Sequence, residues 1–510
     1  MTTLAALTTP SVEYRAVLPL LVVFGAAVAG VLIEGFVPRA RRVRAQLALA
    51  YTALLAALLA VVTLAGTSQL AVMGAVAIDG PTLFLQAAIL IMALFTMVVL
   101  GSRSSMTITA QASSVPGGAE ERTAIRVGAI QTEVFPLLMF AVGGMLLMPA
   151  AADLLTMFIA LEVLSLPLYV LCGLARHRRV LSQEAALKYF LLGAFSSALF
   201  LYGVALLYGY SGTLTLRGIA TAIADNGEGT LAVIGMGLVS VGLLFKVGAV
   251  PFHSWVPDVY QGAPTPITGF MAAATKVAAF GAMLRLFYVA LPDLLAEWRA
   301  ALSVIVVLTM VGGALMAIGQ NDVKRLLGYS AVAQAGFLLM GIVAANDRGV
   351  AAVMFYLLVY GIAAIAAFAL VELVRNLDGV EDNDIRRWSG LARRSPALAW
   401  AFTVCLLAFT GIPLTSGFIS KVAVFSAAAE SGAMALVVVG VLASAIAAFV
   451  YLRVIRVMFF AEPPADARVF IVGSPPVSIA VGAAVALTVL MGVLPQPLLG
   501  LVGSAGAFAG

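Results

Sequence analysis

Long apolar stretches alternate with short polar loops along almost the whole chain. A helix needs about 20 apolar residues to cross the hydrocarbon core of a bilayer, and fourteen runs of roughly that length are present. Proline or glycine stands at most of their ends. The fourth and fifth runs are separated only near 149–153, which leaves thirteen as an alternative count. The runs are at about 17–36, 46–65, 81–101, 133–149, 151–174, 185–210, 230–253, 264–290, 300–319, 325–345, 350–374, 397–426, 432–458 and 477–502.

Basic residues are distributed unevenly between the loops on the two sides. Twenty Arg and Lys residues lie in loops that follow odd-numbered spans, and four lie on the opposite side. Cytoplasmic loops carry such an excess, which predicts that both termini are on the non-cytoplasmic side. The alternation also favours fourteen spans over thirteen, because the loss of one span would scramble it.

Composition excludes several classes of protein. Of the 510 residues, 63% are hydrophobic and only 10% are charged, against about 25% charged in ordinary soluble domains. With a mean hydropathy of +1.09, a soluble enzyme, a nucleic-acid binder or a disordered scaffold is not expected. An outer-membrane barrel would show short alternating strands instead of continuous apolar runs. The fold class is therefore an all-α polytopic membrane protein.

Two further features argue against a bound cofactor or a cleaved leader. Cys172 and Cys405 both stand in apolar runs, and two isolated cysteines cannot hold an iron–sulfur cluster or close a zinc site. We expect no metal or cofactor on this chain, and core positions for both cysteines. The basic segment 39–44 after the first run is a stop-transfer flank, and 102–131 reads as a polar cytoplasmic loop.

Four of the five lysines stand inside apolar runs, whereas the 24 arginines lie mostly in loops. A charge near the bilayer centre costs at least about 2.5–3.5 kcal/mol, so a partner, internal water or a function must offset it. Desolvation can bring a lysine towards releasing its proton near neutral pH, whereas arginine stays protonated. The lysines Lys188, Lys246, Lys276 and Lys421 are therefore the candidate proton carriers.

Not every buried charge has the same interpretation. Lys188 follows Glu184 by four residues, so an i,i+4 salt bridge is as good an explanation as transport. Lys246 is the strongest candidate, because its own span contains no carboxylate. Arg285 stands near a span end, and we expect it to snorkel to the interface.

Two further titratable residues are candidates for the same chemistry. Glu162 lies near the middle of the fifth span, where a carboxylate is expensive, and a buried lysine on another span is its natural partner. His253 lies at the cytoplasmic end of the seventh span. Its near-neutral titration suits proton uptake, and an interfacial structural role is an equally good explanation.

Helix-breaking residues stand beside two of the lysines. Pro251 follows Lys246, and Gly411 and Pro413 precede Lys421, which predicts interrupted helices in spans 7 and 12, as in transporter ion paths. Spans 4–8 and 9–13 would form two five-helix repeats, inverted because five is odd. The predicted divisions are three N-terminal helices in 1–101, a polar loop in 102–132, repeats in 133–290 and 291–459, and a C-terminal loop and helix in 460–510.

Two segments around these residues resemble a known family. FKVGAVPFHSWVPDVYQGAP at 245–264 and EAALKYFLLGAFSSA at 184–198 resemble subunit N of the NADH-quinone oxidoreductases, antiporter-like membrane subunits of bacterial respiratory complex I. The resemblance covers spans 4 to 13. The wider superfamily also contains subunits of multisubunit cation/proton antiporters. Because the chain stops soon after span 14, it resembles subunit N more than the largest antiporter-like subunit, which has a long lateral helix.

The resemblance implies a fold, a function and a set of site residues. It implies fourteen helices with two inverted five-helix repeats, in a bacterial cell (inner) membrane protein. The family's chain of protonatable groups, joined by internal water, falls on Glu162, Lys188, Lys246, Lys276 and Lys421. Flavin, iron–sulfur clusters and quinone are expected in partner subunits.

Three functional hypotheses follow. The first is a proton-translocating subunit of NADH-quinone oxidoreductase. The second is a subunit of a cation/proton antiporter without redox partners, although sodium would favour more mid-membrane carboxylates than Glu162 offers. The third is a structural subunit whose buried charges only set helix register.

Overall fold

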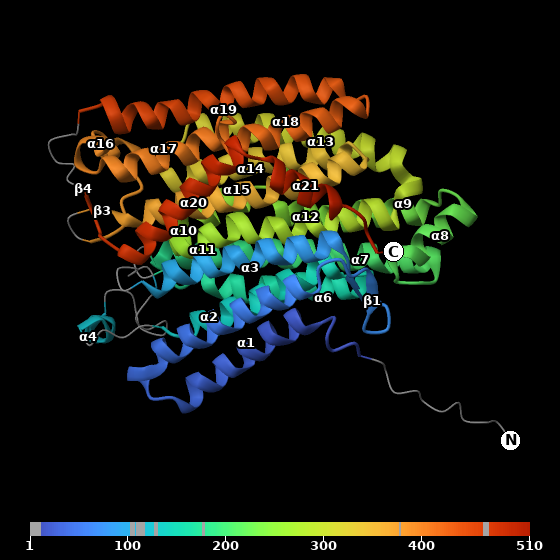
Figure 1. The fold of residues 1–510 in the computed structure, drawn as a ribbon, viewed down its shortest axis with the longest axis horizontal. Helices are drawn as coiled ribbons and strands as arrows, with labels where there is room; N and C mark the ends of the chain where they lie inside the picture. Colours follow the sequence, from blue (N-terminus) through green and yellow to red (C-terminus); the bar gives the residue numbers. More distant parts are fainter. Residues whose placement is uncertain are drawn as a thin grey trace.

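The apolar runs form a bundle of roughly parallel helices (Figure 1). The computed structural model describes residues 12–102, 108, 118–126, 131–175, 179–376, 379–462 and 469–509. Within these residues, twelve helices are long and apolar enough to cross a membrane, and two shorter apolar helices span Val134–Ala150 and Pro396–Thr410. Each of the fourteen runs contains one of these helices, which confirms a polytopic all-α membrane protein. Most of the polar loop 102–131 lies outside the described residues.

The elements follow the order of the expected divisions, and the exact boundaries of those divisions stay a prediction. The label η marks a short 3₁₀ or π turn. The N-terminal elements are α1 (Leu18–Phe36), α2 (Arg39–Thr63), β1 (Gln69–Ala71), β2 (Val76–Ile78), α3 (Gly80–Gly101) and α4 (Ala119–Arg126). The elements of spans 4–8 are α5 (Val134–Leu147), η1 (Met148–Ala150), α6 (Leu154–Cys172), α7 (Arg179–Ser211), α8 (Leu216–Asn226), α9 (Thr230–Val247), α10 (Trp255–Gly262), α11 (Thr265–Phe270), η2 (Met271–Thr275), α12 (Lys276–Arg285) and η3 (Leu286–Ala290).

The second half of the chain repeats this pattern of long and interrupted helices. The elements of spans 9–13 are η4 (Pro292–Leu294), α13 (Leu295–Ile318), α14 (Val323–Val343), α15 (Asp347–Leu373), β3 (Val374–Asn376), η5 (Ile385–Trp388), α16 (Leu391–Arg394), α17 (Pro396–Thr410), α18 (Ser416–Glu430) and α19 (Met434–Phe460). The C-terminal elements are β4 (Val469–Ile471), α20 (Pro475–Val493) and α21 (Gln496–Ser504).

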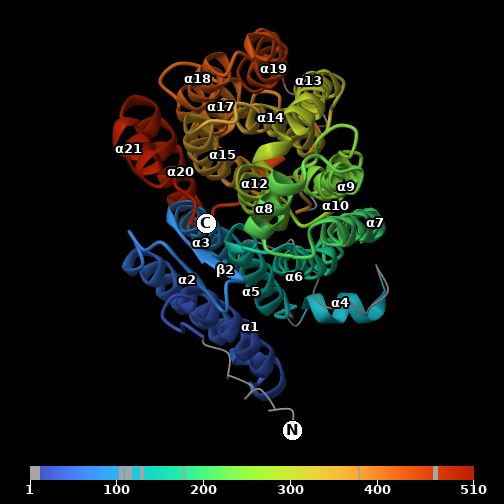
Figure 2. The same ribbon diagram turned by 90° about the vertical axis from the view of Figure 1, so that its right-hand side faces the viewer.

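Three segments form the centre of the bundle. Viewed along the helices, α1 and α2 lie at one edge and α18 and α19 at the other, with α12 and α15 between them (Figure 2). The segment from α11 to η3 and the helices α14 and α15 are almost completely buried, whereas α20 is mostly exposed. A side chain on α12 therefore lies inside the protein and away from lipid.

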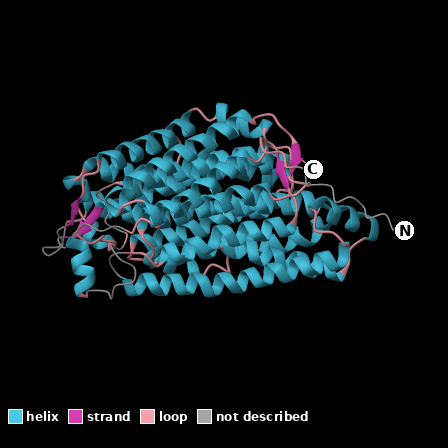
Figure 3. Ribbon diagram, turned by 90° about the horizontal axis from the view of Figure 1, so that it is seen from below, coloured by secondary structure: helices cyan, strands magenta, loops and turns pink. Residues whose placement is uncertain are grey.

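The two small two-stranded sheets lie at opposite ends of the bundle (Figure 3). The antiparallel pair β1–β2 closes one end, and β3 pairs with the distant β4 at the other. Glu13 accepts a hydrogen bond from the Val72 backbone beside β1, at 2.8 Å. The Ala509 backbone donates to Asp79 just after β2, at 2.8 Å. Both ends of the described chain thus lie at one end of the bundle, as an even number of spans requires.

Spans 7 and 12 are interrupted, as the sequence predicted. The first interruption separates α9 from α10, and the second separates α17 from α18. The helix α9 ends at Val247, earlier than the apolar run that predicted a span to residue 253, because Gly248 takes the left-handed conformation and ends the helix. A π turn just before Lys276 was not predicted.

Arg285 corrects one expectation from the sequence. It does not snorkel to the interface: its side chain is 1% exposed and its Nη2 donates to both oxygens of Asp79, at 2.9 and 2.8 Å. Its Nε donates to the Pro149 carbonyl and its Nη2 to Thr82. Asp79 stands 206 residues earlier in the chain, so no local pattern could identify it as the partner. Together these contacts join α12 to the start of α3 and to η1.

Replacement of Arg285 by Met should destabilise the protein strongly. Removing one partner of a buried ion pair leaves an uncompensated charge and costs about 3–5 kcal/mol. The double variant Asp79→Asn with Arg285→Met removes both charges and should recover much of that loss. The measurement is the thermal unfolding midpoint of the purified protein. As a control, Arg348→Met removes an exposed ion pair with Glu430 and should leave the midpoint unchanged; an equal fall in both single variants would contradict the assignment.

Candidate functional site

The first interrupted helix exposes a backbone carbonyl to a lysine. Gly248, with φ of 73°, ends α9, and the carbonyl of Val247 accepts a hydrogen bond from Lys276 Nζ at 2.8 Å. The indole of Trp255, on the far side of the interruption, donates to the Phe245 carbonyl at 3.0 Å. Side chains therefore replace the helical hydrogen bonds that these carbonyls lose.

The second interruption repeats the same arrangement. Gly411, with φ of 84°, ends α17, and the carbonyl of Thr410 accepts from Lys421 Nζ at 2.8 Å. The ammonium also donates to Ser444 Oγ at 3.1 Å and lies 4.3 Å from the Phe337 ring centre. A Cβ at Gly411 would lie 2.8 Å from the Lys421 stem, so a residue without a side chain is needed here.

The ends of α9 and α17 explain why a lysine can be held without a carboxylate. The last carbonyls of a helix have no partner within it and carry the negative end of its dipole. A cation placed there is stabilised, and the open carbonyl is satisfied. Lys276 and Lys421 are 3% and 4% exposed, and among the described residues neither forms an ion pair.

Lys246 is held by hydroxyl groups. It lies in the last turn of α9, is 3% exposed, and donates to Ser165 Oγ at 2.7 Å and to Tyr189 OH at 2.9 Å. The Tyr189 ring stacks on the Trp255 indole, with centroids 4.6 Å apart. Because Trp255 also bonds to the end of α9, the interruption and the Lys246 contact belong to one packed unit.

Glu162 lies close to this unit but makes no direct contact with a lysine among the described residues. It stands one turn before Ser165 on α6, so the two side chains share a face of the helix. The buried oxygen Oε1 has no hydrogen-bond partner within the described part of the chain. The α6 residue in contact with Lys246 is Ser165, and the pairing of Glu162 with a lysine stays a prediction.

Lys188 differs from the other three lysines in its surroundings. Its i,i+4 salt bridge with Glu184 is confirmed at 2.7 Å, and a second bridge joins it to Asp258 at 2.7 Å. Asp258 is also paired with Arg325 at 2.6 Å. The side chain is 41% exposed, so Lys188 belongs to a charged network that fastens α10 to α7 and α14.

His253 lies in the turn between α9 and α10, half-buried. Its ring is 6.5 Å from the Tyr329 ring, centre to centre, and its buried Nδ1 has no hydrogen-bond partner among the described residues. The structure therefore places His253 at the first interruption, two residues before Trp255, with a partly exposed side chain.

Comparison with known proteins gives the family. Residues 151–447 match the family model described as NADH:quinone oxidoreductase/Mrp antiporter, TM. The chain is 58% identical to NADH-quinone oxidoreductase subunit N of Rhodococcus opacus, over 99% of this chain and 98% of that protein. The chain belongs to the subunit N family of NADH-quinone oxidoreductases.

Solved structures agree with this assignment. A chain of respiratory complex I from Thermus thermophilus superposes with a TM-score of 0.78 at 33% identity, covering 96% of this chain and all of that one. A chain of the Mrp complex from a Dietzia species has a TM-score of 0.80 at 22% identity, covering 97% of each chain. The second likeness shows the fold alone. The match to the NADH:quinone oxidoreductase/Mrp antiporter family model, over residues 151–447, spans all five candidate residues and both interruptions.

Sequence reasoning missed several polar residues of this subunit N family protein. Lys324 was counted as a loop residue, yet it is 2% exposed and donates to the Ala263 carbonyl at 2.7 Å. One signal was available, because Lys324 is the only lysine among loops that otherwise use arginine. On α14, Gln334 accepts from Tyr356 and donates to the Phe409 carbonyl at 2.8 Å, beside the second interruption.

Gly411→Ala should displace Lys421 from its carbonyl. The new Cβ would meet the lysine stem, and such overpacking costs about 1–3 kcal/mol in addition to the strain of a positive φ. The measurements are the unfolding midpoint and the density of the Lys421 side chain in a cryo-EM map. Gly432→Ala is the matched control, because Gly432 has a similar φ of 80° but nothing within 4 Å of a Cβ. Equal effects of the two variants would show that strain alone is responsible.

Proposed function

We propose that this chain is a proton-translocating subunit in the membrane arm of an NADH-quinone oxidoreductase, and that it contributes no redox centre. The observation that carries the proposal is the set of three buried lysines, Lys246, Lys276 and Lys421, held by neutral acceptors in a protein of the subunit N family. NADH oxidation and quinone reduction would take place in partner subunits, which would hold the flavin, iron–sulfur clusters and quinone.

The hydrogen-bond partners of the lysines suit reversible loss of a proton. The hydroxyls of Ser165 and Tyr189 can each donate or accept, so their contacts with Lys246 survive when the ammonium becomes an amine. The carbonyls of Val247 and Thr410 can accept from either form, although the bond from the ammonium is the stronger. By contrast, Arg285 in its pair with Asp79 is a fixed cation. We therefore assign proton transfer to the lysines and a structural role to Arg285.

The order of the groups along the bundle suggests a route. Lys246 directly precedes Val247, whose carbonyl holds Lys276, so these two lysines meet at one interruption. Beside the second interruption lies a cavity of about 10 Å³ lined in part by Gln334, Tyr356 and Ser416. That volume is about the space of one water, and Ser416 Oγ, buried without a partner in the described residues, is a group that such a water would satisfy.

The proposed mechanism begins with a change of charge in a neighbouring subunit. That change would alter the electrostatic interaction between Glu162 and Lys246. Lys246 would then pass its proton towards Lys276, and the proton would reach Lys421 through the internal water. The charged network of Lys188, Glu184 and Asp258 would hold α10, and His253 at the same interruption is placed for proton exchange. We also propose that the termini face the non-cytoplasmic side of a bacterial cell membrane.

The antiporter alternative is less well supported. The likeness to the Mrp complex is at 22% identity, whereas the identity to subunit N of Rhodococcus opacus is 58%. A sodium path would also need carboxylate or carbonyl oxygens as ligands, and the open carbonyls at both interruptions are already bonded to lysines. A pull-down of the tagged chain in mild detergent separates the two: flavin and iron–sulfur partners with NADH–quinone activity support the proposal, and only small hydrophobic partners contradict it.

Lys246→Ala should sharply reduce proton translocation while the complex still assembles, because the proton loses its first internal acceptor. The measurement is the number of protons moved per NADH oxidised in inverted membrane vesicles. An unchanged ratio would refute this route. Lys276→Ala and Lys421→Ala test the structural hypothesis, which predicts poor assembly but a normal ratio for each complex that does assemble.

A further inference from the structure

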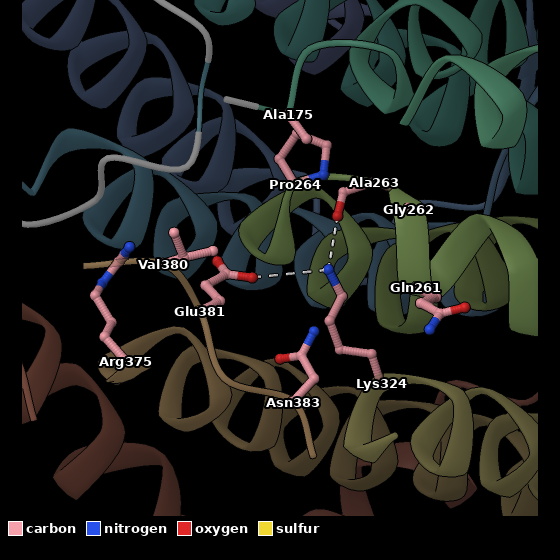
Figure 4. A pocket seen from close by; sticks show the side chains of 10 residues that line it. All are labelled: Ala175, Gln261, Gly262, Ala263, Pro264, Lys324, Arg375, Val380, Glu381 and Asn383. Carbon is pink, nitrogen blue, oxygen red and sulfur yellow. Dashed lines mark hydrogen bonds and ion pairs between the residues drawn. The ribbon is translucent and has the colours of Figure 1, made fainter. Parts of the chain in front are cut away.

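A polar cavity lies where the two repeats meet, at the end of the bundle that carries β3 (Figure 4). Its volume is about 30 Å³. The end of α10 and the start of α14 form one side, and Arg375 together with Val380, Glu381 and Asn383 forms the other. The side chains that matter are Gln261, Lys324, Arg375, Glu381 and Asn383, together with the Ala263 carbonyl.

Lys324 and Glu381 are the two titratable groups that face each other across this cavity. Lys324 Nζ lies 4.0 Å from Glu381 Oε2, and Thr265 connects them by accepting from Lys324 at 3.0 Å and donating to Glu381 at 2.7 Å. The exposed fractions of the two charged side chains are 2% and 15%. The pair is therefore buried but loosely joined, unlike the close contact of Arg285 with Asp79.

Three polar atoms of the lining have no partner among the described residues. They are Glu381 Oε1, Asn383 Oδ1 and Arg375 Nε, which are two acceptors and one donor. A water donates two hydrogen bonds and accepts others, and a buried water typically makes about three. The volume has room for about two waters. The lining thus fits water better than a cation or an anion, since either ion would leave groups of one kind unmatched.

The cavity is connected to the lysine row on its inner side. The Ala263 carbonyl accepts a hydrogen bond from Lys324 at 2.7 Å. Two residues later begins the helical segment Thr265–Ala290, which carries Lys276. On the outer side, Gln261 leads to the charged groups Asp322 and Arg325.

We propose that the Lys324–Glu381 cavity is a hydrated proton-loading site that exchanges protons between the water at this end of the bundle and the lysine row. This inference rests on the proposed function. A cavity water gives a proton to Glu381 Oε1 and takes up another from the water outside, so that no hydroxide remains. Lys324 passes its own proton inward to a lysine of the row that is in the amine form, and itself becomes an amine. The Glu381 carboxyl then passes its proton to Lys324. The cycle moves one proton and leaves both groups in their starting charge states.

Two substitutions separate proton loading from a merely structural latch between the repeats. Glu381→Gln keeps the shape of the side chain and its contact with Thr265 but cannot take up a proton. Lys324→Arg keeps the charge and the hydrogen-bond donors but cannot release one. A latch would tolerate the arginine, whereas a proton-loading site would not.

The experiment measures protons moved per NADH oxidised by the whole complex in inverted vesicles. Both variants should assemble and should show the same fall in that ratio as Lys246→Ala. Asp382→Asn is the matched control, because Asp382 is the adjacent carboxylate, pairs with Arg387 at 3.2 Å and does not line the cavity; its ratio should stay at the wild-type value.

Each outcome decides the proposal. A wild-type ratio in either assembled variant overturns it, even where Lys246→Ala is impaired and the proposed function stands. An unimpaired Lys246→Ala variant counts against the proposed route itself. If Glu381→Gln does not assemble, Lys324→Arg decides alone, and if neither assembles, the cavity is a latch. A cryo-EM map of the wild-type complex should show ordered water between Glu381 and Asn383, and a dry cavity would also overturn the proposal.

Discussion

An ammonium group bonded to the open end of an interrupted helix is the contact on which the interior of this protein depends. Interrupting a helix inside a membrane leaves carbonyls that no lipid can satisfy. Burying a lysine leaves a charge that the same environment penalises. Placed together, the Val247 carbonyl with Lys276 and the Thr410 carbonyl with Lys421 satisfy both requirements. Without the lysine, the interrupted helix would be less well tolerated in the membrane, and the same holds for the lysine without the interruption.

This arrangement divides the buried cations into two kinds. Arg285 contacts both oxygens of Asp79 and cannot give up its proton, so its effect is to fasten three segments together. Lys246, Lys276 and Lys421 contact hydroxyls and carbonyls, which remain satisfied in either protonation state. If carboxylates held these lysines instead, they would resist proton transfer, since every transfer would have to break an ion pair.

The sequence was sufficient to predict the span count, both interruptions and the burial of Lys246, Lys276 and Lys421, because each leaves a local trace. The length of an apolar run identifies a membrane span, and glycine and proline mark helix ends near Lys246 and Lys421. The contacts were not predictable, because they join distant segments. Asp79 meets Arg285 across 206 residues, and Lys324 reaches Glu381 and Ala263 only when the repeats pack. Position in a loop suggested that Lys324 was exposed, whereas tertiary packing buries it.

The second half of the first interrupted helix links the charged surface to the interior. α10 is held from outside by the pairs of Asp258 with Lys188 and Arg325, and at its start Trp255 bonds to the end of α9 and stacks on Tyr189. A displacement of α10 would therefore change the hydroxyl contact of Lys246 directly, since Tyr189 belongs to both contacts. Because α10 ends at the Lys324–Glu381 cavity, the same displacement would also change the distance between those two groups. One short helix thus connects the surface network, the first lysine and the cavity, and this is why charges as far apart as Asp258 and Lys246 cannot be considered independent.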